Sequence, residues 1–230
     1  MALARSVEAG EIASVAVEAL LDRVDGEVRF DDGSRAAYST DSSNFRQVPL
    51  GVVVPRTIDA AVEAVAACHE HDLPIVSRGG GTSLAGQCTN EAVMLDFSKY
   101  CHRVVSVDQE NRRCVVEPGI VLDVLNRELA PTGLRFGPEP ATHQNCTIGG
   151  MIGNNSCGAT AQRTGKVVDN VVSLDVLLYD GTRFTARQTN DRDYAVAERM
   201  GERGFYIPSG MALTVEQMDT VIEKTREVLA

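Results

Sequence analysis

The 230-residue sequence has no apolar run that approaches the roughly 18 residues needed to span a bilayer. Its N-terminus, MALARSVEAGEIASVAVEALLDRV, carries acidic residues through the apolar stretch, which is typical of an amphipathic helix rather than a secretory signal. Positive charge is also scarce, because 22 Lys and Arg stand against 32 Asp and Glu, a formal net charge of −10. This balance argues against nucleic acid or an anionic membrane as the main partner.

The sequence also lacks the spacing of a metal site. No two of its six cysteines form C-x-x-C, which excludes the usual zinc-ribbon and iron–sulfur motifs. His69 and His71 are two positions apart at the end of a predicted helix, so they do not share a helical face. Without a signal peptide, the cysteines are expected to be reduced thiols of a cytoplasmic protein. They stand at positions 68, 88, 101, 114, 146 and 157.

Hydrophobic residues make up 43% of the chain, enough for a proper core, and neither internal repeats nor low-complexity segments interrupt it. Helical spacing of Ile12, Val15, Ala16, Ala19 and Leu20 predicts a first helix. Apolar runs predict strands at 50–55, 74–77 and 92–97. Between the first two, a helix capped by Thr57 is expected to bury Ile58, Ala61, Val62, Val65 and Ala66. This order favours a parallel βαβ unit followed by a glycine loop.

The second half of the sequence predicts hairpins and a long loop rather than a parallel βαβ unit. Segments 103–107 and 113–117 predict a hairpin, and Leu122, Leu125 and Leu129 an amphipathic helix that stops at Pro131 and Gly133. Residues 137–165 show little periodicity and are interpreted as a long functional loop. A further hairpin is expected over 171–186, with a type I′ turn at Asp180-Gly181. Beyond residue 190, Thr214 and Gln217 form a capping box before an amphipathic helix.

The most unusual stretch is RGGGTSLAGQ, residues 78–87, because such a glycine run gives up backbone entropy. A dinucleotide fingerprint fails because Leu84 stands where its last glycine belongs. A Walker A loop fails because Gln87 and Cys88 replace its lysine and its magnesium ligand. Besides a plain glycine turn, there remains a nest of backbone N–H groups with the hydroxyls of Thr82 and Ser83, suited to a pyrophosphate that is held but not cleaved.

A second unusual region, 136–172, contains paired prolines, a TIGG run and an NNSCG run. Gly149 and Gly150 allow close approach of another backbone or of a planar ligand. Asn154, Asn155 and Ser156 offer neutral hydrogen-bonding groups. Flat apolar contact with amide groups at its edge is the kind of surface that a flavin ring requires.

The segments SRGGGTSLAGQ, PEPATHQNCTIGGMIGNNSCG and GKVVDNVVSLDVLLYDGT, in this order and spacing, resemble the PCMH-type FAD-binding domain. Within that superfamily the chain is most similar to FAD-linked oxidases of the glycolate oxidase and D-lactate dehydrogenase branch, in particular the large members with a C-terminal iron–sulfur part. The resemblance covers roughly residues 10–190. It implies an α+β fold: a small parallel α/β lobe that ends in the glycine loop, then a mainly antiparallel lobe, with FAD between them.

The resemblance also implies which residues bind FAD. The glycine loop would wrap the pyrophosphate. Residues 138–147, with Gly149 and Gly150, would line the cofactor, residues 154–158 would lie near it, and Val171 would lie close to the adenine. Covalently flavinylated relatives carry a histidine in the glycine loop, which this sequence lacks, so the FAD is expected to be dissociable. The residues so implied are Arg78, Gly79, Gly80, Gly81, Thr82, Ser83, Leu84, Gly86, Gln87, Pro138, Glu139, Pro140, Thr142, Asn145, Cys146, Thr147, Gly149, Gly150, Asn154, Asn155, Ser156, Gly158 and Val171.

The implied function is that of an FAD-binding module of an oxidoreductase acting on a small D-2-hydroxy acid such as D-lactate or glycolate. Proton removal from the substrate hydroxyl needs a base, and His143 is the candidate. The family's substrate domain is missing from these residues, so a non-catalytic FAD-binding fragment is the alternative. Residues 1–190 are expected to form the FAD-binding domain. Residues 191–230 are expected to form a helical tail, and its segment 204–230 resembles the end of DegT/DnrJ-type aminotransferases, which suggests a foreign or truncated tail.

Overall fold

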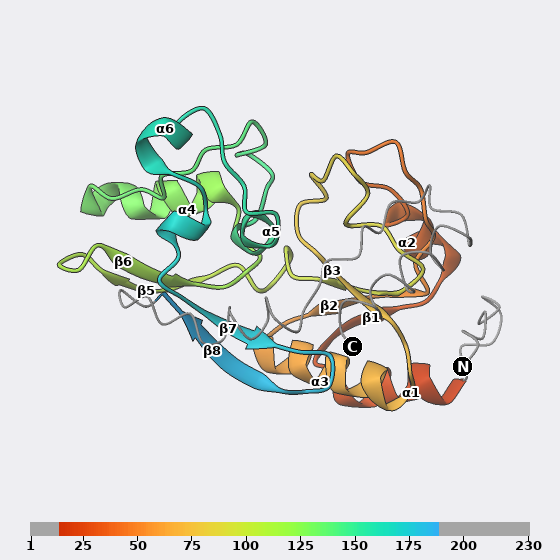
Figure 1. Ribbon diagram of the computed structural model, residues 1–230. Helices are drawn as coiled ribbons and strands as arrows, with labels where there is room; N and C mark the ends of the chain where they lie inside the picture. The colour runs from red at the N-terminus through yellow and green to blue at the C-terminus, as the bar shows by residue number, and fades with distance from the viewer. Residues whose placement is uncertain (1–13, 189–230) are drawn as a thin grey trace, which may run out of the picture. The chain divides into compact units, whose positions relative to one another are not determined.

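The computed structural model describes residues 14–188. Its largest sheet has four strands in the order β1-β2-β4-β3, where β1 is Gly26–Arg29, β2 Gly51–Pro55, β3 Ile75–Arg78 and β4 Val93–Asp96. Strands β2, β4 and β3 are parallel, whereas β1 runs antiparallel along β2 (Figure 1). The three predicted strands are therefore confirmed, and β1 is an antiparallel edge strand that the sequence pattern did not predict.

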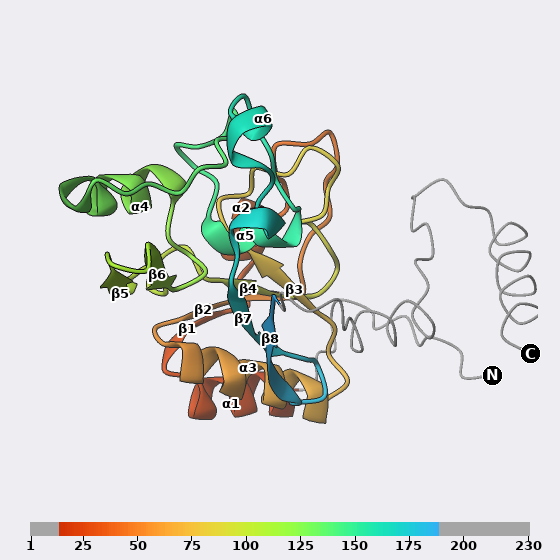
Figure 2. The same ribbon diagram turned by 60° about the vertical axis from the view of Figure 1, so that its left-hand side comes forward.

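Helices α1 (Ser14–Arg23) and α3 (Ile58–Glu70) cover one face of this sheet, as Figures 1 and 2 both show. The Thr57 side chain caps α3 by accepting the Ala60 N–H. The predicted helices are correct, but their buried faces differ in detail: Val15 and Ile58 are exposed. Small residues replace them at the interface, because α1 and α3 pack closely against each other and against the strands. Those buried on α3 are Ala60, Ala61, Ala64, Val65, Ala67 and Cys68.

The opposite face of the sheet is buried as well. Val52, Val54 and Met94 form a second cluster there, against which Tyr38 and Tyr100 pack. Tyr38 directly follows the short helix α2 (Asp32–Ala37), which brings its ring to this face. Burial on both faces explains why β2 is an uninterrupted apolar run rather than an alternating one.

The connection from β3 to β4 determines where the glycine loop lies. Because β3 and β4 are parallel neighbours, the chain must travel back along the whole strand length between them. Residues 79–92 make this return without a helix or strand. The glycine loop is thus the start of a crossover at the carboxyl end of β3, where open α/β sheets bind their ligands.

The remaining elements are a hairpin and several short helices. Strands β5 (Val104–Asp108) and β6 (Arg113–Val116) form the predicted hairpin, and α4 (Leu122–Leu129) follows it. Leu122, Leu125 and Leu129 are buried as expected, and the helix ends through the 3-10 turn η1 (Ala130–Thr132). These leucines pack with α5 (Ile148–Gly153) in a separate hydrophobic core.

The interpretation of 137–165 as one long loop is wrong, because this region contains α5 and α6 (Ala161–Thr164). Helix α5 contains three glycines among its six residues, and because glycine has a low helix propensity, the sequence pattern did not predict this helix. Tertiary packing stabilises this helix instead, because Ile148 and Met151 enter the core and Thr147 caps the N-terminus.

The last described elements are the 3-10 turn η2 (Val168–Asn170) and the hairpin of β7 (Ser173–Leu177) and β8 (Arg183–Arg187). The hairpin is confirmed, but its predicted type I′ turn is wrong. Gly181 has φ +84°, Asp180 is not at positive φ, and the Gly181 N–H bonds to the Leu178 carbonyl across a longer connection. Within this connection, the Tyr179 hydroxyl donates to the Leu73 carbonyl at 2.8 Å and thereby docks the hairpin beside α3.

The fold is α+β, as predicted. Figure 2 shows the four-stranded sheet and the helices beside it from a second direction. No helix within residues 14–188 combines the length and apolarity required to cross a bilayer. The predictions for Ile12, for the tail beyond residue 190 and for the Thr214–Gln217 capping box lie outside the described residues.

Candidate cofactor-binding site

The glycine loop, defined as residues 79–87, needs its glycines for two different reasons. Gly81 and Gly86 have φ angles of +64° and +78°, a conformation that other residues adopt at an energetic cost. Gly79 and Gly80 have ordinary backbone angles but no room for a side chain. A β-carbon on Gly79 would lie 2.0 Å from Thr147 Oγ1, and one on Gly80 would lie 2.0 Å from the Asn145 carbonyl oxygen.

These two contacts bring the predicted halves of the site together. The glycine loop follows β3, whereas Asn145 and Thr147 lead into α5. The sequence indicated that something approaches the backbone of the loop. At Gly79 and Gly80 it is the chain's own 145–147 segment, so part of the glycine run serves the packing of the protein.

The loop nevertheless keeps hydrogen-bonding capacity for a ligand. In residues 14–188 no acceptor is bonded to the N–H groups of Gly79, Gly80, Gly81, Thr82 or Leu84. These residues are partly buried or exposed, so the N–H groups are accessible, and a run of free backbone N–H groups in a loop favours an anion. The donor set therefore fits the diphosphate of a nucleotide cofactor.

Arg78, which precedes the glycine loop, bonds across to its far end and to the segment beside it. Its Nη1 donates to the Cys88 carbonyl at 3.3 Å and its Nη2 to the Thr40 carbonyl at 2.8 Å. The guanidinium also lies directly against Gly81, since a β-carbon there would be 2.6 Å from Nη2. Both acceptors are neutral, so a positive charge lies at the base of the glycine loop.

Residues 40–46 run along the glycine loop, and the sequence analysis did not identify them. The Ser42 N–H and hydroxyl both donate to the Gly81 carbonyl, at 3.0 and 3.2 Å. The Phe45 ring fills the space where a β-carbon on Gly86 would lie. Asp41 Oδ2 is buried and has no hydrogen-bond partner in the described part of the chain. These contacts join residues about 40 positions apart, which no local motif could have indicated.

The predicted base His143 is held by one specific partner. Its Nδ1 lies 2.8 Å from Asp123 Oδ1, and the Asp123 N–H donates to the His143 carbonyl. Because an ionised carboxylate can only accept, Nδ1 donates in this contact, and Nε2 points to no partner in the described residues. Asp123, in the first turn of α4, is a second residue that the sequence analysis missed.

Other predicted residues make contacts within the protein. The Gly149 N–H donates to the Pro118 carbonyl at 2.8 Å, so the close approach expected there is made by backbone. A β-carbon on Gly158 would lie 1.8 Å from the Glu139 carbonyl oxygen. Asn155 Oδ1 accepts the Val168 N–H, and Asn154 Nδ2 donates to the Ser156 hydroxyl. These contacts fix the shape of the 138–158 region.

Two predicted residues turn toward the core instead. Cys146 is buried in the cluster formed by α4 and α5, and Val171 packs against the same cluster. Burial raises the pKa of the Cys146 thiol. All six cysteines are free thiols, and no group of three or more His, Cys, Asp or Glu side chains within residues 14–188 is arranged to hold a metal ion.

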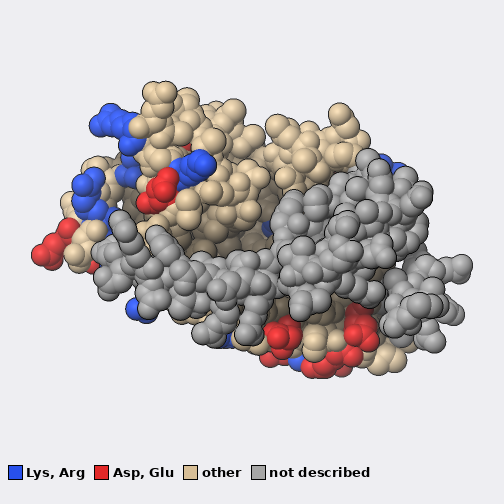
Figure 3. Space-filling model, viewed as in Figure 1, with Lys and Arg blue, Asp and Glu red and all other residues tan. Residues whose placement is uncertain are grey.

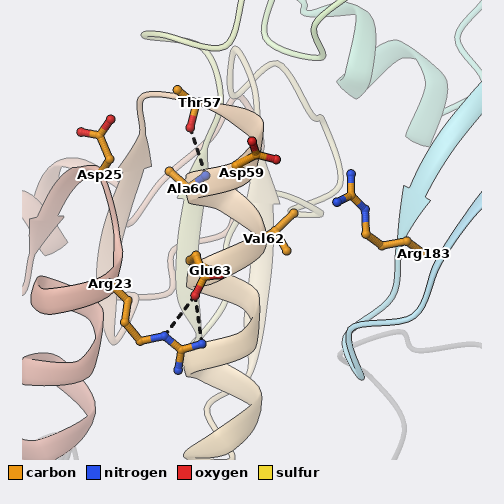
Figure 4. A pocket seen from close by; sticks show the side chains of 8 residues that line it. All are labelled: Arg23, Asp25, Thr57, Asp59, Ala60, Val62, Glu63 and Arg183. Carbon is orange, nitrogen blue, oxygen red and sulfur yellow. Dashed lines mark hydrogen bonds and ion pairs between the residues drawn. The ribbon is translucent and has the colours of Figure 1, made fainter.

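A hollow of about 410 Å³ lies elsewhere, beside the first turn of α3 (Figure 4). Three acids, Asp25, Asp59 and Glu63, line it together with Arg23 and Arg183, and Arg23 already bonds to Glu63 and Glu70. Figure 3 shows acidic side chains along the edge where Figure 1 draws α1 and α3. An anionic cofactor is therefore disfavoured at this hollow and favoured at the glycine loop. The exposed acids of these helices are Glu18, Asp22, Asp59, Glu63 and Glu70.

Residues 49–187, more than half of the chain, match the family model described as an FAD binding domain. The chain belongs to this family. Its match begins just before β2 and ends with β8, and thus includes the glycine loop, the 138–158 region and the elements that position them. The expected resemblance to FAD-binding domains is thereby confirmed.

Curated proteins similar to this FAD-binding domain include enzymes that act on 2-hydroxy acids by name. It is 34% identical over 169 residues to glycolate oxidase subunit GlcD of Bacillus subtilis strain 168, covering 72% of this chain and 36% of that protein. It is 36% identical over 150 residues to D-2-hydroxyglutarate dehydrogenase of Escherichia coli K12, covering 64% and 15%. The chain thus spans about a third or less of these relatives.

Solved structures confirm the fold of the FAD-binding domain. Alkyldihydroxyacetonephosphate synthase superposes with a TM-score of 0.69 at 20% identity, over 81% of this chain and 40% of that one. BBE-like 1 of Physcomitrella patens gives 0.65 at 22%, over 76% and 38%. At these identities the likeness describes the fold alone. The tail beyond residue 190 lies outside the described residues, so its resemblance to DegT/DnrJ-type aminotransferases stays a prediction.

Proposed function

We propose that this domain binds FAD non-covalently, with the diphosphate on the glycine loop and the flavin against the 138–150 segment. The main support is the set of N–H groups from Gly79 to Leu84 that lack an acceptor in the described residues, beside an arginine bonded only to carbonyls. The hydroxyls of Thr82 and Ser83 add donors for phosphate oxygens. The loop contains no histidine, the residue that carries the flavin covalently in some relatives of the fold.

We further propose that the domain serves an oxidoreductase acting on a D-2-hydroxy acid such as D-lactate or glycolate. The printed names of its relatives, which include a D-lactate dehydrogenase of Kluyveromyces lactis, support this substrate class. When bound, FAD supplies the acceptor for the hydride that leaves the hydroxyl-bearing carbon. The protein's part is to hold the cofactor and to exclude water from its reacting face.

His143 is proposed as the residue that accepts the hydroxyl proton, at Nε2. Its Nδ1–H donates to Asp123, which fixes the ring and leaves Nε2 without a partner in the described part of the chain. The side chain is about one-third exposed and is therefore open to a ligand. A carboxylate that orients a base in this way is a recurring feature of proton-transfer sites.

A non-catalytic FAD-binding fragment remains the second candidate, because the chain spans only 36% of GlcD and 15% of D-2-hydroxyglutarate dehydrogenase. In this case a substrate domain would be supplied by the part of the relatives that the chain does not cover, and in the larger relatives an iron–sulfur part as well. We place the domain in the cytoplasm, where its six free thiols would stay reduced.

Titration of the purified chain with FAD, followed by flavin fluorescence, tests the proposal. Saturable binding is expected, and acid precipitation should leave all flavin in the supernatant. Anaerobic addition of D-lactate or glycolate then separates the two candidates: bleaching of the flavin supports the oxidoreductase, and unchanged absorbance with bound FAD supports the fragment. A folded chain that does not bind FAD would overturn both.

A further inference from the structure

Arg78 and Asp96 are neighbours in the sheet that do not form an ion pair. They are register partners at the carboxyl ends of the parallel strands β3 and β4. Two residues earlier on each strand, the partners Val76 and Met94 lie on the sheet face that packs against Tyr38. Because side chains alternate along a strand, Arg78 and Asp96 share that face. No ion pair between them occurs within the described residues.

Tyr38 lies between the two charges. Its hydroxyl donates to Asp96 Oδ2 at 2.6 Å, and its ring lies under the Arg78 guanidinium, with Cζ 5.5 Å from the ring centroid. The other carboxylate oxygen of Asp96 accepts both the N–H and the hydroxyl of Ser98, at 2.8 and 2.7 Å. Asp96 is therefore buried with its hydrogen-bonding needs met by neutral donors.

The charge of Arg78 is consequently directed to the glycine loop. Among the described residues its guanidinium donates only to the Thr40 and Cys88 carbonyls, directly beneath Gly81. The other acid nearby, Asp41, forms no ion pair with Arg78 within the described residues: its Oδ1 accepts the Ser43 N–H, and its Oδ2 has no hydrogen-bond partner there. If Asp96 were free to turn toward the guanidinium, the pair would neutralise the charge at the base of the anion-binding loop.

We propose that Tyr38 is a positioning residue that keeps Asp96 from pairing with Arg78, so that the guanidinium charge remains available to the diphosphate of the cofactor. The inference rests on the proposed FAD-binding function and adds to it a specificity element outside the glycine loop. Tyr38 itself does not contact the loop's N–H groups. It affects FAD binding only by determining which groups the Arg78 guanidinium bonds to.

The test is the Tyr38→Phe variant of the whole chain, which loses only the hydroxyl. Asp96 then lacks one donor and is expected to pair with Arg78. The Kd for FAD and for ADP, which shares the diphosphate, should rise about tenfold, while the Kd for riboflavin, which has no phosphate, stays unchanged. The dependence of the FAD Kd on salt concentration should become shallower, since less charge meets the ligand.

A second change separates this role from a general loss of structure. In the double variant Y38F/D96N, a neutral amide replaces the carboxylate and cannot neutralise Arg78, so FAD and ADP affinity should return toward the original value. A merely structural role predicts a further loss instead. Tyr100→Phe is the matched control, because the Tyr100 hydroxyl also bonds to a carboxylate, Glu27, on the same sheet face. It should lower thermal stability without changing the FAD Kd.

The outcomes separate FAD binding by the domain from the role of Tyr38 in it. Failure of the unchanged chain to bind FAD would overturn the proposed function and this inference with it. Normal binding by the unchanged chain together with an unchanged Kd in Y38F would overturn the role of Tyr38 alone. So would a double variant that binds FAD no better than Y38F.

Discussion

The backbone of Gly80 lies against the backbone of Asn145 so closely that a β-carbon on Gly80 would stand 2.0 Å from the Asn145 carbonyl oxygen. This contact joins the glycine loop to the segment that leads into α5. It also means that a substitution at Gly80 first affects packing and only then ligand binding.

Gly80→Ala should therefore destabilise the domain even without FAD. The added methyl group meets backbone atoms that cannot rotate away, so the free energy of unfolding should fall by about 1–3 kcal/mol. Urea unfolding followed by circular dichroism measures this. Gly153→Ala is the matched control, since nothing lies within 4 Å of a β-carbon there. Equal stability of the two variants would contradict the contact.

Tyr179→Phe should loosen the β7–β8 hairpin from α3. The variant loses the hydroxyl that donates to the carbonyls of Leu73 and Cys68, and the Leu73 carbonyl has no substitute within the described residues. The expected loss is about 1 kcal/mol, with faster amide exchange in residues 173–187. Amide exchange of β2 should not change, and a uniform increase over the whole domain would argue against a local docking role.

Glu27 should make stability depend on pH in the acid range. Hydrogen bonds from Lys99 and Tyr100 lower the pKa of Glu27 to about 2 from its usual value of 4.5. A carboxylate with a lowered pKa stabilises the folded state above about pH 4.5, and this contribution disappears as the pH falls toward 2. Melting temperatures of the original chain and of Glu27→Gln should thus differ at pH 7 and converge only as the pH falls to about 2 and below. Glu128→Gln, at an exposed position on α4, should show no such convergence.

Asp123→Ala should release the ring of His143. In the original chain the proton is expected on Nδ1, and the variant should lose this preference because the acceptor at 2.8 Å is gone. Long-range 1H–15N spectra of the imidazole nitrogens report the tautomer, with His143→Gln for assignment. The signals of His69 and His71, at the end of α3, serve as internal controls. An unchanged His143 spectrum would show that Asp123 does not orient it.

Short-range features of the chain could be predicted from the sequence because their causes are local. The apolar run of β2, the Thr57 cap and the leucine spacing of α4 each act within a few residues, and all three are confirmed. Helix α5 was missed for the opposite reason. Its glycines disfavour a helix, and only the packing of Ile148 and Met151 into a distant core stabilises it.

The sequence by itself determined the short strands, the helix caps and the glycine loop, because apolar periodicity and glycine content are properties of neighbouring residues. The resemblance of its three motif segments to a known family added the α+β class and the FAD-binding family. Only the tertiary structure decided what the loop touches. It placed Asn145 against Gly80, Asp123 against His143, and Tyr38 between Arg78 and Asp96. These contacts join residues 20 to 65 positions apart, and they exist only because β4 inserts between β2 and β3 and the second core folds against the loop.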